Sequence, residues 1–314
     1  MMNRFKQWFR QFGTFWPVSE QIKRMKLEVQ VDQVAQDLED ANLFFGHGTD
    51  NAFDEAVWLV LEALGFDAGA DDIPWAQDLT EHQRDSVHDL LSKRIETRQP
   101  LAYLVNKAWF AGHEFFIDSR AIVPRSHIGE WIPDRFDPWL ANENVSAILD
   151  LCTGGGCIAV SLALAFPEAT VDASDLSQDA LDVARRNVER YGVEKRVRII
   201  EGDLFSGIGN KKYDLIVCNP PYVSDELMSA LPKEYHYEPE LAFAGGQTGL
   251  DFIQRLLKEA ADHLSPEGFL VVEAGSAQQA LETAYVKMPF TWLMSENEES
   301  VVFIISADEL AALS

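Results

Sequence analysis

Strand-like apolar runs alternate with helical stretches along the C-terminal part of the chain, and this alternation limits the possible folds more than any other feature. Helical spacing separates the first five runs, and strands that alternate with helices form parallel sheets. Only a short polar turn, residues 296–299, joins the last two runs, so these must be antiparallel neighbours. The pattern predicts an α/β fold with a Rossmann-like seven-stranded sheet that ends in an antiparallel hairpin. The predicted strands are 147–152, 170–175, 197–203, 213–219, 268–274, 290–295 and 301–306.

The preceding part of the chain has the spacing of helices instead. Apolar stripes run through residues 31–38 and 53–64, as on the buried faces of two helices. A third helix is predicted to begin after Thr80, where Gln83 completes a capping box, and to end before Pro100. This part of the chain therefore predicts a small helical domain.

Two shorter segments flank the helical part. Residues 1–26 are basic and place aromatic residues at helical spacing, which is typical of a helix on a membrane surface, but they lack the pattern of a signal peptide. We interpret them as a dispensable extension. Residues 115–118 and 121–124 alternate like the two strands of a hairpin. The predicted segments are a basic extension over 1–30 that is a candidate for disorder, a helical domain over 31–114, a hairpin linker over 115–128 and a catalytic α/β domain over 129–314.

The net charge of −25, from 51 acidic and 26 basic side chains, restricts the possible partners. Such a surface repels phosphate backbones and attracts basic proteins, so naked DNA or RNA is disfavoured as the sole substrate.

The three cysteines, Cys152, Cys157 and Cys218, lie in or beside apolar runs and indicate reduced thiols in a cytoplasmic protein. We expect neither a membrane span nor a metal site, because neither pattern is present.

A glycine-rich loop, Asp150-Leu151-Cys152-Thr153-Gly154-Gly155-Gly156, follows the first predicted strand and opens a helix. Glycines let a backbone approach a ligand closely, and a helix N-terminus presents unpaired N–H groups. Such a loop suits either a pyrophosphate or the methionine carboxylate of S-adenosylmethionine. The spacing from Gly154 to Ala159, with Asp175 further on, also fits a dinucleotide fingerprint. The loop alone therefore leaves both cofactors open.

Acidic residues at successive strand ends favour S-adenosylmethionine over a nicotinamide nucleotide. Asp150 places a carboxylate where it suits the ammonium of a methionine and repels a pyrophosphate. Asp175 closes the second strand, where it is positioned to accept both ribose hydroxyls. Asp203 closes the third strand and, with Leu204, offers an acidic and apolar edge for adenine. Each acid alone is also typical of a turn. The predicted cofactor-binding residues are Asp150, Thr153, Gly154, Gly155, Gly156, Asp175, Asp203, Leu204 and Asn219.

The tetrapeptide Asn219-Pro220-Pro221-Tyr222 follows the fourth predicted strand. Two prolines cannot extend a strand, so the chain must turn at the carboxyl edge of the sheet, where α/β folds bind ligands. A side-chain amide beside rigid carbonyls suits a planar N–H₂ group, because each of its hydrogens needs an acceptor. An Asn-Pro turn is also common between elements. Together with the acids upstream, the motif indicates methyl transfer to nitrogen.

Several blocks of the chain resemble, in order, the N5-glutamine methyltransferases that modify translation proteins. These blocks are 100–103, 109–115, 123–126, 150–156 and 219–222. The resemblance covers nearly everything from residue 31 to residue 306. It is closer to the branch that acts on ribosomal large-subunit protein three than to the release-factor branch, which typically has Gly in place of Cys152. His127 and Gly155 depart from the family pattern, which has Pro and Ser at these positions.

The resemblance implies a class-I S-adenosylmethionine methyltransferase that modifies a glutamine nitrogen of that basic ribosomal protein. The implied catalytic residues are Asn219, Pro220 and Tyr222, and the implied substrate-binding residues are Asn219, Pro220, Pro221, Tyr222 and Arg125. We expect the Asn219 side-chain oxygen and the Pro220 carbonyl to accept the two N–H bonds of the glutamine amide. Tyr222 would pack on that amide and Pro221 would stiffen the loop, with no dedicated base.

Three other functions remain open at this point. The release-factor branch would methylate a glutamine of peptide chain release factors, and an enzyme with the same Asn-Pro-Pro-Tyr motif would methylate amino groups of nucleic-acid bases. A different class is a non-catalytic ribosome-assembly factor that binds a basic client through its acidic surface. Gly245-Gly246-Gln247 matches the tripeptide modified in release factors, but we interpret it as a turn before the next helix.

Overall fold

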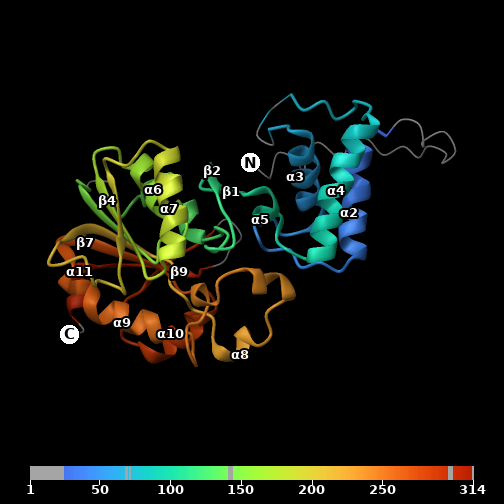
Figure 1. Ribbon diagram of the computed structural model, residues 1–314. Helices are drawn as coiled ribbons and strands as arrows, with labels where there is room; N and C mark the ends of the chain where they lie inside the picture. Colours follow the sequence, from blue (N-terminus) through green and yellow to red (C-terminus); the bar gives the residue numbers. More distant parts are fainter. Residues whose placement is uncertain (1–24, 68–69, 71, 141–143, 296–299, 313–314) are drawn as a thin grey trace. The chain divides into compact units, whose positions relative to one another are not determined.

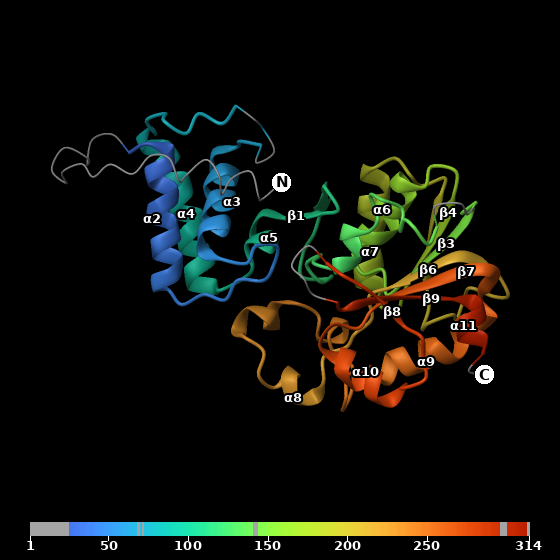
Figure 2. The same cartoon turned by 180° about the vertical axis from the view of Figure 1, so that it is seen from behind.

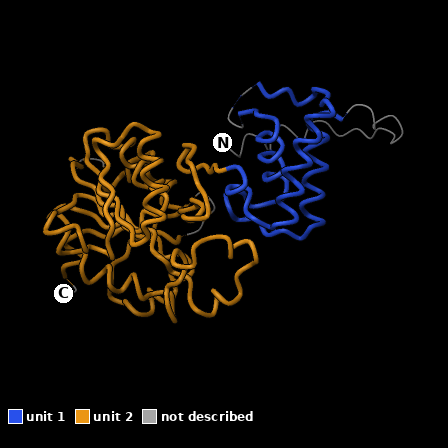
Figure 3. The backbone as a smooth tube through the Cα atoms, viewed as in Figure 1, with its two compact units in different colours: residues 1–105 blue, residues 106–314 orange. Residues whose placement is uncertain are grey.

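The computed structural model describes residues 25–67, 70, 72–140, 144–295 and 300–312 of the 314-residue chain. The chain divides into two compact units, residues 1–105 and 106–314 (Figure 3). The aromatic residues of the basic extension and the polar turn 296–299 lie outside the described residues, so the expectations for them stay predictions. None of the helices in the described ranges is long and apolar enough to cross a membrane.

In its described part, the first unit consists of helices, and the three longer ones lie side by side (Figures 1 and 2). The predicted capping box is present at the third of these helices. The Thr80 side chain accepts a hydrogen bond from the Gln83 N–H at 3.3 Å, while Gln83 Oε1 accepts from the Thr80 N–H at 3.0 Å. The helices are α2 Leu27–Asp40, α3 Ala52–Leu64, α4 Glu81–Thr97 and α5 Leu101–Val105.

A buried ion pair joins α3 to α4. Arg94 Nε donates to Glu55 Oε1 at 2.7 Å, and Arg94 Nη2 donates to the Phe44 carbonyl at 3.2 Å. A buried charge is costly without a partner, so the pair fixes the chain before α3 against both helices. Helical spacing alone did not predict this contact, because it joins residues far apart in the sequence.

The second unit contains the predicted seven-stranded sheet, in the order β5-β4-β3-β6-β7-β9-β8. The neighbouring strands from β5 to β7 are parallel, whereas β9 is antiparallel to both β7 and β8. The Rossmann-like sheet and its terminal antiparallel hairpin are therefore confirmed. The strands are β3 Ala147–Leu151, β4 Thr170–Asp175, β5 Val197–Glu201, β6 Tyr213–Cys218, β7 Leu264–Glu273, β8 Thr291–Leu293 and β9 Val302–Ser306.

Helices cover both faces of this sheet, α6 and α7 on one side and α9, α10 and α11 on the other (Figure 1). Alternation along β6 divides its side chains between two cores. Leu215 and Val217 join the core under α6 and α7, whereas Ile216 and Cys218 join the core under α9. The bounds are α6 Cys157–Ala165, α7 Gln178–Arg190, α8 Asp225–Met228, α9 Asp251–Glu259, α10 Gln278–Ala284 and α11 Ala307–Ala311.

The hairpin before the sheet differs from the expected one. It pairs β1 Lys107–Phe110 with β2 His113–Phe116, rather than residues 115–118 with 121–124. Ala111 and Gly112 at its turn both have positive φ, 47° and 79°, and such a turn matches the twist of paired strands. Asp118 instead binds the Arg120 guanidinium two residues later, which makes a tight local turn there. The two units divide after Val105, before this hairpin, whereas the sequence analysis predicted that the helical domain ends at residue 114.

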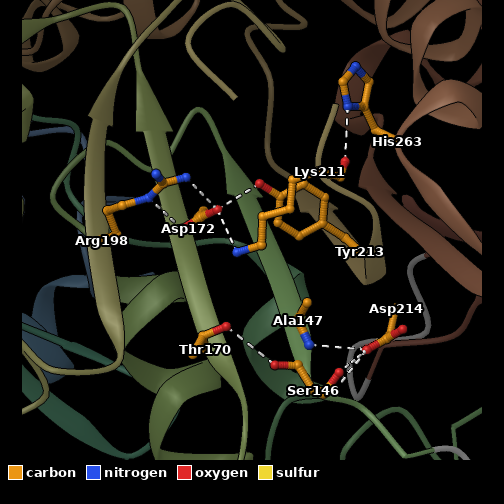
Figure 4. A network of polar contacts seen from close by, with 9 residues as sticks. All are labelled: Ser146, Ala147, Thr170, Asp172, Arg198, Lys211, Tyr213, Asp214 and His263. Carbon is orange, nitrogen blue, oxygen red and sulfur yellow. Dashed lines mark hydrogen bonds and ion pairs between the residues drawn. The ribbon is translucent and has the colours of Figure 1, made fainter. Parts of the chain in front are cut away.

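A network of polar contacts surrounds the buried carboxylate of Asp172 on β4 (Figure 4). Asp172 is 2% exposed and accepts hydrogen bonds from Arg198 and Lys211, each at 2.9 Å, and from the Tyr213 hydroxyl at 2.7 Å. Burial raises the pKa of Asp172, but the bonds from these three donors outweigh burial and lower it below its ordinary value. The carboxylate therefore links β4, β5 and β6 in its ionised form.

We expect Asp172→Asn to lower the free energy of unfolding by about 2 kcal/mol, because it removes a charged acceptor from three donors. Urea denaturation followed by circular dichroism at neutral pH measures this loss. An unchanged midpoint would mean that the network contributes nothing to stability.

The same contribution depends on pH in a defined direction. Because the folded pKa of Asp172 is lowered, its stabilisation is complete above about pH 4, the ordinary value for an unfolded Asp, and is lost as the pH falls through the folded value. The stability difference between the natural protein and Asp172→Asn should therefore shrink below about pH 4. Denaturation curves at several pH values measure this convergence.

Candidate functional site

The strand order reverses between β3 and β6, and the predicted site residues gather at this reversal. From β3 the chain continues to β4 and β5 on one side of the sheet, whereas β6 and β7 lie on the other side. The loops after parallel strands share one edge, and ligands of open α/β sheets bind where the order reverses. A cavity of about 630 Å³ lies at this edge of the second unit.

Most of the predicted site residues line this cavity. Asp150 and Gly156 do not line it, although they belong to the same loop as the residues that do. The predicted residues that line the cavity are Arg125, Thr153, Gly154, Gly155, Asp175, Asp203, Leu204, Asn219, Pro220, Pro221 and Tyr222.

The glycines of the loop after β3 have different roles. Gly154 lines the cavity with φ of +55°, a conformation that favours glycine. Gly156 precedes α6 with φ of +78°, and a Cβ at this position would lie 2.9 Å from the Ala184 Cβ on α7. Gly156 therefore allows α6 and α7 to pack closely and does not face the cavity.

Asp150 is buried behind the loop. Its Oδ2 accepts the Thr153 hydroxyl at 2.5 Å, and its Oδ1 has no hydrogen-bond partner among the residues that the structure describes. Burial raises the pKa of Asp150 to about 7. Asp150 therefore orients Thr153 from behind the loop.

Asp175 stands at the end of β4 with its carboxylate in the cavity wall. Its two oxygens accept the N–H groups of Gly154, at 2.8 Å, and Ser177, at 2.9 Å. Burial raises its pKa. Each carboxylate oxygen has a further lone pair, so Asp175 is able to accept two hydroxyl groups while it holds the glycine loop.

Asp203 and Leu204 follow β5 and complete this side of the cavity. Asp203 binds Arg255 Nη2 of α9 at 2.8 Å, and both side chains are about half exposed. Arg255 also lines the cavity, although no sequence pattern pointed to this residue. Arg255 joins α9 to the end of β5 by its ion pair with Asp203, which the strand pattern did identify.

The Asn219–Tyr222 loop forms the opposite wall. Asn219 Oδ1 is buried and has no hydrogen-bond partner in the described part of the chain. The Tyr222 hydroxyl donates to Glu273 Oε1 at 2.9 Å. Burial and the neighbouring Glu273 carboxylate raise the pKa of Tyr222 well above its usual value, so the hydroxyl keeps its proton. The loop thus presents an unpaired acceptor beside a fixed ring.

Arg125 lines the cavity, but its guanidinium already has partners. It binds both carboxylate oxygens of Glu238 at 2.8 Å, and it lies over the rings of Tyr235 and Phe243, 5.4 and 5.6 Å from their centres. Glu238 Oε1 also accepts the Val123 N–H at 2.8 Å. The contacts of Arg125 therefore join the segment before η3 (His127–Glu130) to the segment after α8, and its predicted contact with substrate stays a prediction.

Of two further features near the site, the sequence analysis predicted one and missed the other. The expected turn at Gly245-Gly246-Gln247 is confirmed, since Gly246 has φ of +80° and α9 begins soon after, at Asp251. Glu273 was missed, although it ends β7 as Asp175 ends β4 and also lines the cavity. The same pattern that identified Asp175, an acid at the end of a strand, would therefore have identified Glu273.

Comparisons with known proteins identify relatives of this chain. A family model described as the methyltransferase small domain matches residues 138–231. A ribosomal protein uL3 glutamine methyltransferase of Neisseria gonorrhoeae is 45% identical over 272 residues, which are 86% of this chain and 91% of that protein. A protein of the same name from Neisseria meningitidis is 44% identical over 86% of this chain and 89% of that protein. A solved methyltransferase from Pyrococcus furiosus is 21% identical over 60% of this chain and 87% of that chain, with a TM-score of 0.41.

The two Neisseria relatives extend over most of this chain, whereas the family model matches only the stretch that includes β3 to β6. Similarity at this level over nearly the whole length of both proteins establishes membership of a family. This chain is an S-adenosylmethionine-dependent methyltransferase, and it belongs to the family of ribosomal protein uL3 glutamine methyltransferases.

Proposed function

We propose that the enzyme methylates the side-chain nitrogen of a glutamine in ribosomal protein uL3. The single observation that supports this proposal best is the buried Asn219 Oδ1, an acceptor without a partner among the described residues. A buried acceptor that stays unpaired is unfavourable, and a substrate N–H restores the missing bond. The names of the relatives supply the identity of the client.

S-adenosylmethionine supplies a methyl group on a positively charged sulfur. We propose that Thr153, Gly154 and Gly155 hold its methionine part, with Asp150 orienting Thr153 from behind. A direct contact between Asp150 and the methionine ammonium stays a prediction, because Asp150 does not line the cavity.

The remaining cofactor contacts belong to the ends of β4 and β5. Asp175 accepts the ribose hydroxyls with the lone pairs that Gly154 and Ser177 leave free. Leu204 lies against the adenine, and the Asp203 side chain, paired with Arg255, borders it.

The chain's contribution to the reaction is orientation. A carboxamide nitrogen is a weak nucleophile, because its lone pair is delocalised into the carbonyl. Asn219 Oδ1 and the Pro220 carbonyl each accept one N–H of the glutamine and thereby aim the nitrogen at the methyl group. Fixing two reactants in this way supplies effective molarities of about 10⁵ M or more. Pro221 stiffens the loop, Tyr222 packs on the amide, and the proton leaves after transfer without a dedicated base.

The charge of the chain supports a basic protein as client. A net charge of −25 attracts basic proteins and disfavours naked nucleic acid. We expect the enzyme to act in the cytoplasm, where ribosomal proteins are synthesised. Release factors are the second candidate, because the same amide geometry suits any exposed glutamine.

Incubation with isotope-labelled S-adenosylmethionine tests the client directly. We expect label on purified uL3, confined to one glutamine peptide that gains the mass of one methylene group, and little label on release factor or duplex DNA. Tandem mass spectrometry locates the modified residue. Label on release factor alone would refute uL3 as the client and leave the glutamine chemistry intact.

We expect Asn219→Ala to lower kcat by about 100-fold or more, as the loss of one positioned hydrogen bond does in other active sites. The affinity for S-adenosylmethionine, measured by calorimetry, should stay within about threefold, because Asn219 is expected to act mainly on the amide. Asn144→Ala is the matched control, since Asn144 is exposed in the same unit and does not line the cavity. Retained turnover would remove Asn219 from the mechanism.

We expect Asp175→Asn to weaken S-adenosylmethionine binding by about 10- to 100-fold, because charge-assisted hydrogen bonds to the ribose are lost. Calorimetry measures the dissociation constant. Asp182→Asn serves as the control, since Asp182 is exposed on α7 and paired with Arg185. Equal affinities for both variants would exclude Asp175 as a ribose ligand.

A further inference from the structure

Glu273 is a buried carboxylate at the cavity edge that neither sequence pattern nor the proposed chemistry has used. It is the last residue of β7, it is 2% exposed, and it lines the cavity. Cys218 of β6 pairs with Val272 of β7 in the parallel register, so the next residues along the two strands are Asn219 and Glu273. Glu273 therefore stands beside the predicted catalytic asparagine on the neighbouring strand.

The Glu273 carboxylate collects donors from two other parts of the chain. Its Oε2 accepts the Ser126 hydroxyl at 2.6 Å and the His127 N–H at 2.9 Å, and its Oε1 accepts the Tyr222 hydroxyl at 2.9 Å. A carboxylate is an acceptor only, so its ionised form satisfies all three donors at once. The acid thus joins β7, the start of η3 and the Asn219–Tyr222 loop at one point.

Tyr222 is confined from several sides, and Glu273 fixes the end of its side chain. A Cβ on Gly275 would lie 2.3 Å from the Tyr222 ring, so the ring lies against the backbone there. The Tyr222 carbonyl accepts the Ser276 hydroxyl at 3.3 Å. β6 holds the loop at Asn219, and Glu273 holds it at Tyr222. Between these two points lie the two prolines.

We propose that Glu273 is a positioning residue for methyl transfer, which acts by holding Tyr222 so that the loop presents the Asn219 and Pro220 oxygens to the substrate amide. The proposal rests on the proposed function in that the amide is taken to be the substrate. Glu273 itself donates no group to the reaction. Loss of the Glu273 carboxylate should therefore change kcat and the order of the loop, and leave the affinity for S-adenosylmethionine unchanged.

Glu273→Gln is the primary variant, because it keeps the size of the side chain and replaces one acceptor oxygen by a donor. The N–H₂ group then faces either the Tyr222 hydroxyl or the pair of donors from Ser126 and His127, so at least one donor loses its acceptor. We expect kcat to fall by about 30-fold, since small displacements of reacting groups are costly, while the dissociation constant for S-adenosylmethionine changes by less than about threefold.

Asp172→Asn is the matched control. Asp172 is also 2% exposed and also accepts hydrogen bonds from three residues of the same unit, but it does not line the cavity. It reports the cost of losing a buried carboxylate in this sheet. We expect Asp172→Asn to lower the melting temperature and to leave kcat within about twofold of the natural enzyme.

A double-mutant cycle with Tyr222→Phe tests whether Glu273 acts through Tyr222. Tyr222→Phe alone should lower kcat, and adding Glu273→Gln to it should lower kcat by less than about threefold further. Full multiplication of the two effects would overturn the proposal, as would a Glu273→Gln enzyme with the kcat of the natural protein.

Amide hydrogen exchange gives a readout that does not depend on the client. The N–H groups of Val223 and Asp225, which donate to the carbonyls of Phe243 and Gly246, report on the loop. We expect both to exchange about tenfold faster in Glu273→Gln and in Tyr222→Phe, but not in Asp172→Asn.

If Glu273→Gln fails to fold, Tyr222→Phe decides the outcome, because unchanged exchange and kcat in that variant would refute the proposal. If the natural enzyme does not methylate uL3, the proposed function fails, whereas the exchange experiment still tests Glu273.

Discussion

The parallel strands of the sheet end at one edge, and every feature of the site depends on this constraint. β3, β4, β5, β6 and β7 all run in the same direction, so their following loops meet although they are far apart in the sequence. The reversal of order between β3 and β6 separates the glycine loop from the Asn219–Tyr222 loop and leaves space between them. In the proposed reaction, the methyl donor lies on one side of this space and the acceptor nitrogen on the other.

Carboxylates at strand ends organise this edge, and each one is stabilised in a different way. Asp150 holds Thr153 and keeps one oxygen unpaired, whereas Asp175 holds the backbone of the glycine loop. Glu273 accepts three hydrogen bonds, and Asp203 is paired with an arginine. Asp150, Asp175 and Glu273 thus support the loops of this edge through their hydrogen bonds. The acids at successive strand ends do lie at one edge of the sheet, as the sequence pattern predicted, and their contacts with a ligand stay predictions.

The sequence predicted what depends on local patterns. Apolar alternation located all seven strands of the sheet, and the Thr80 capping box located the start of α4. The sequence did not predict contacts that join distant segments, such as Arg125 with Glu238 or Tyr222 with Glu273. No spacing rule connects residues that are 113 or 51 positions apart. The hairpin was misplaced since the positive φ of Ala111 is a property of the folded turn, and alanine gives no signal for it.

The outermost strand of the sheet has a further consequence. Arg198 lies on β5, the edge strand of the sheet in the described part of the chain, and its side chain is 58% exposed while it binds Asp172. An exposed strand border offers unpaired backbone groups to other chains, and a fixed positive charge there discourages intermolecular strand addition. At the opposite border, β8 has only three residues, which is too short to template a long ladder. Both margins of the sheet thus carry a feature that limits aggregation by strand addition.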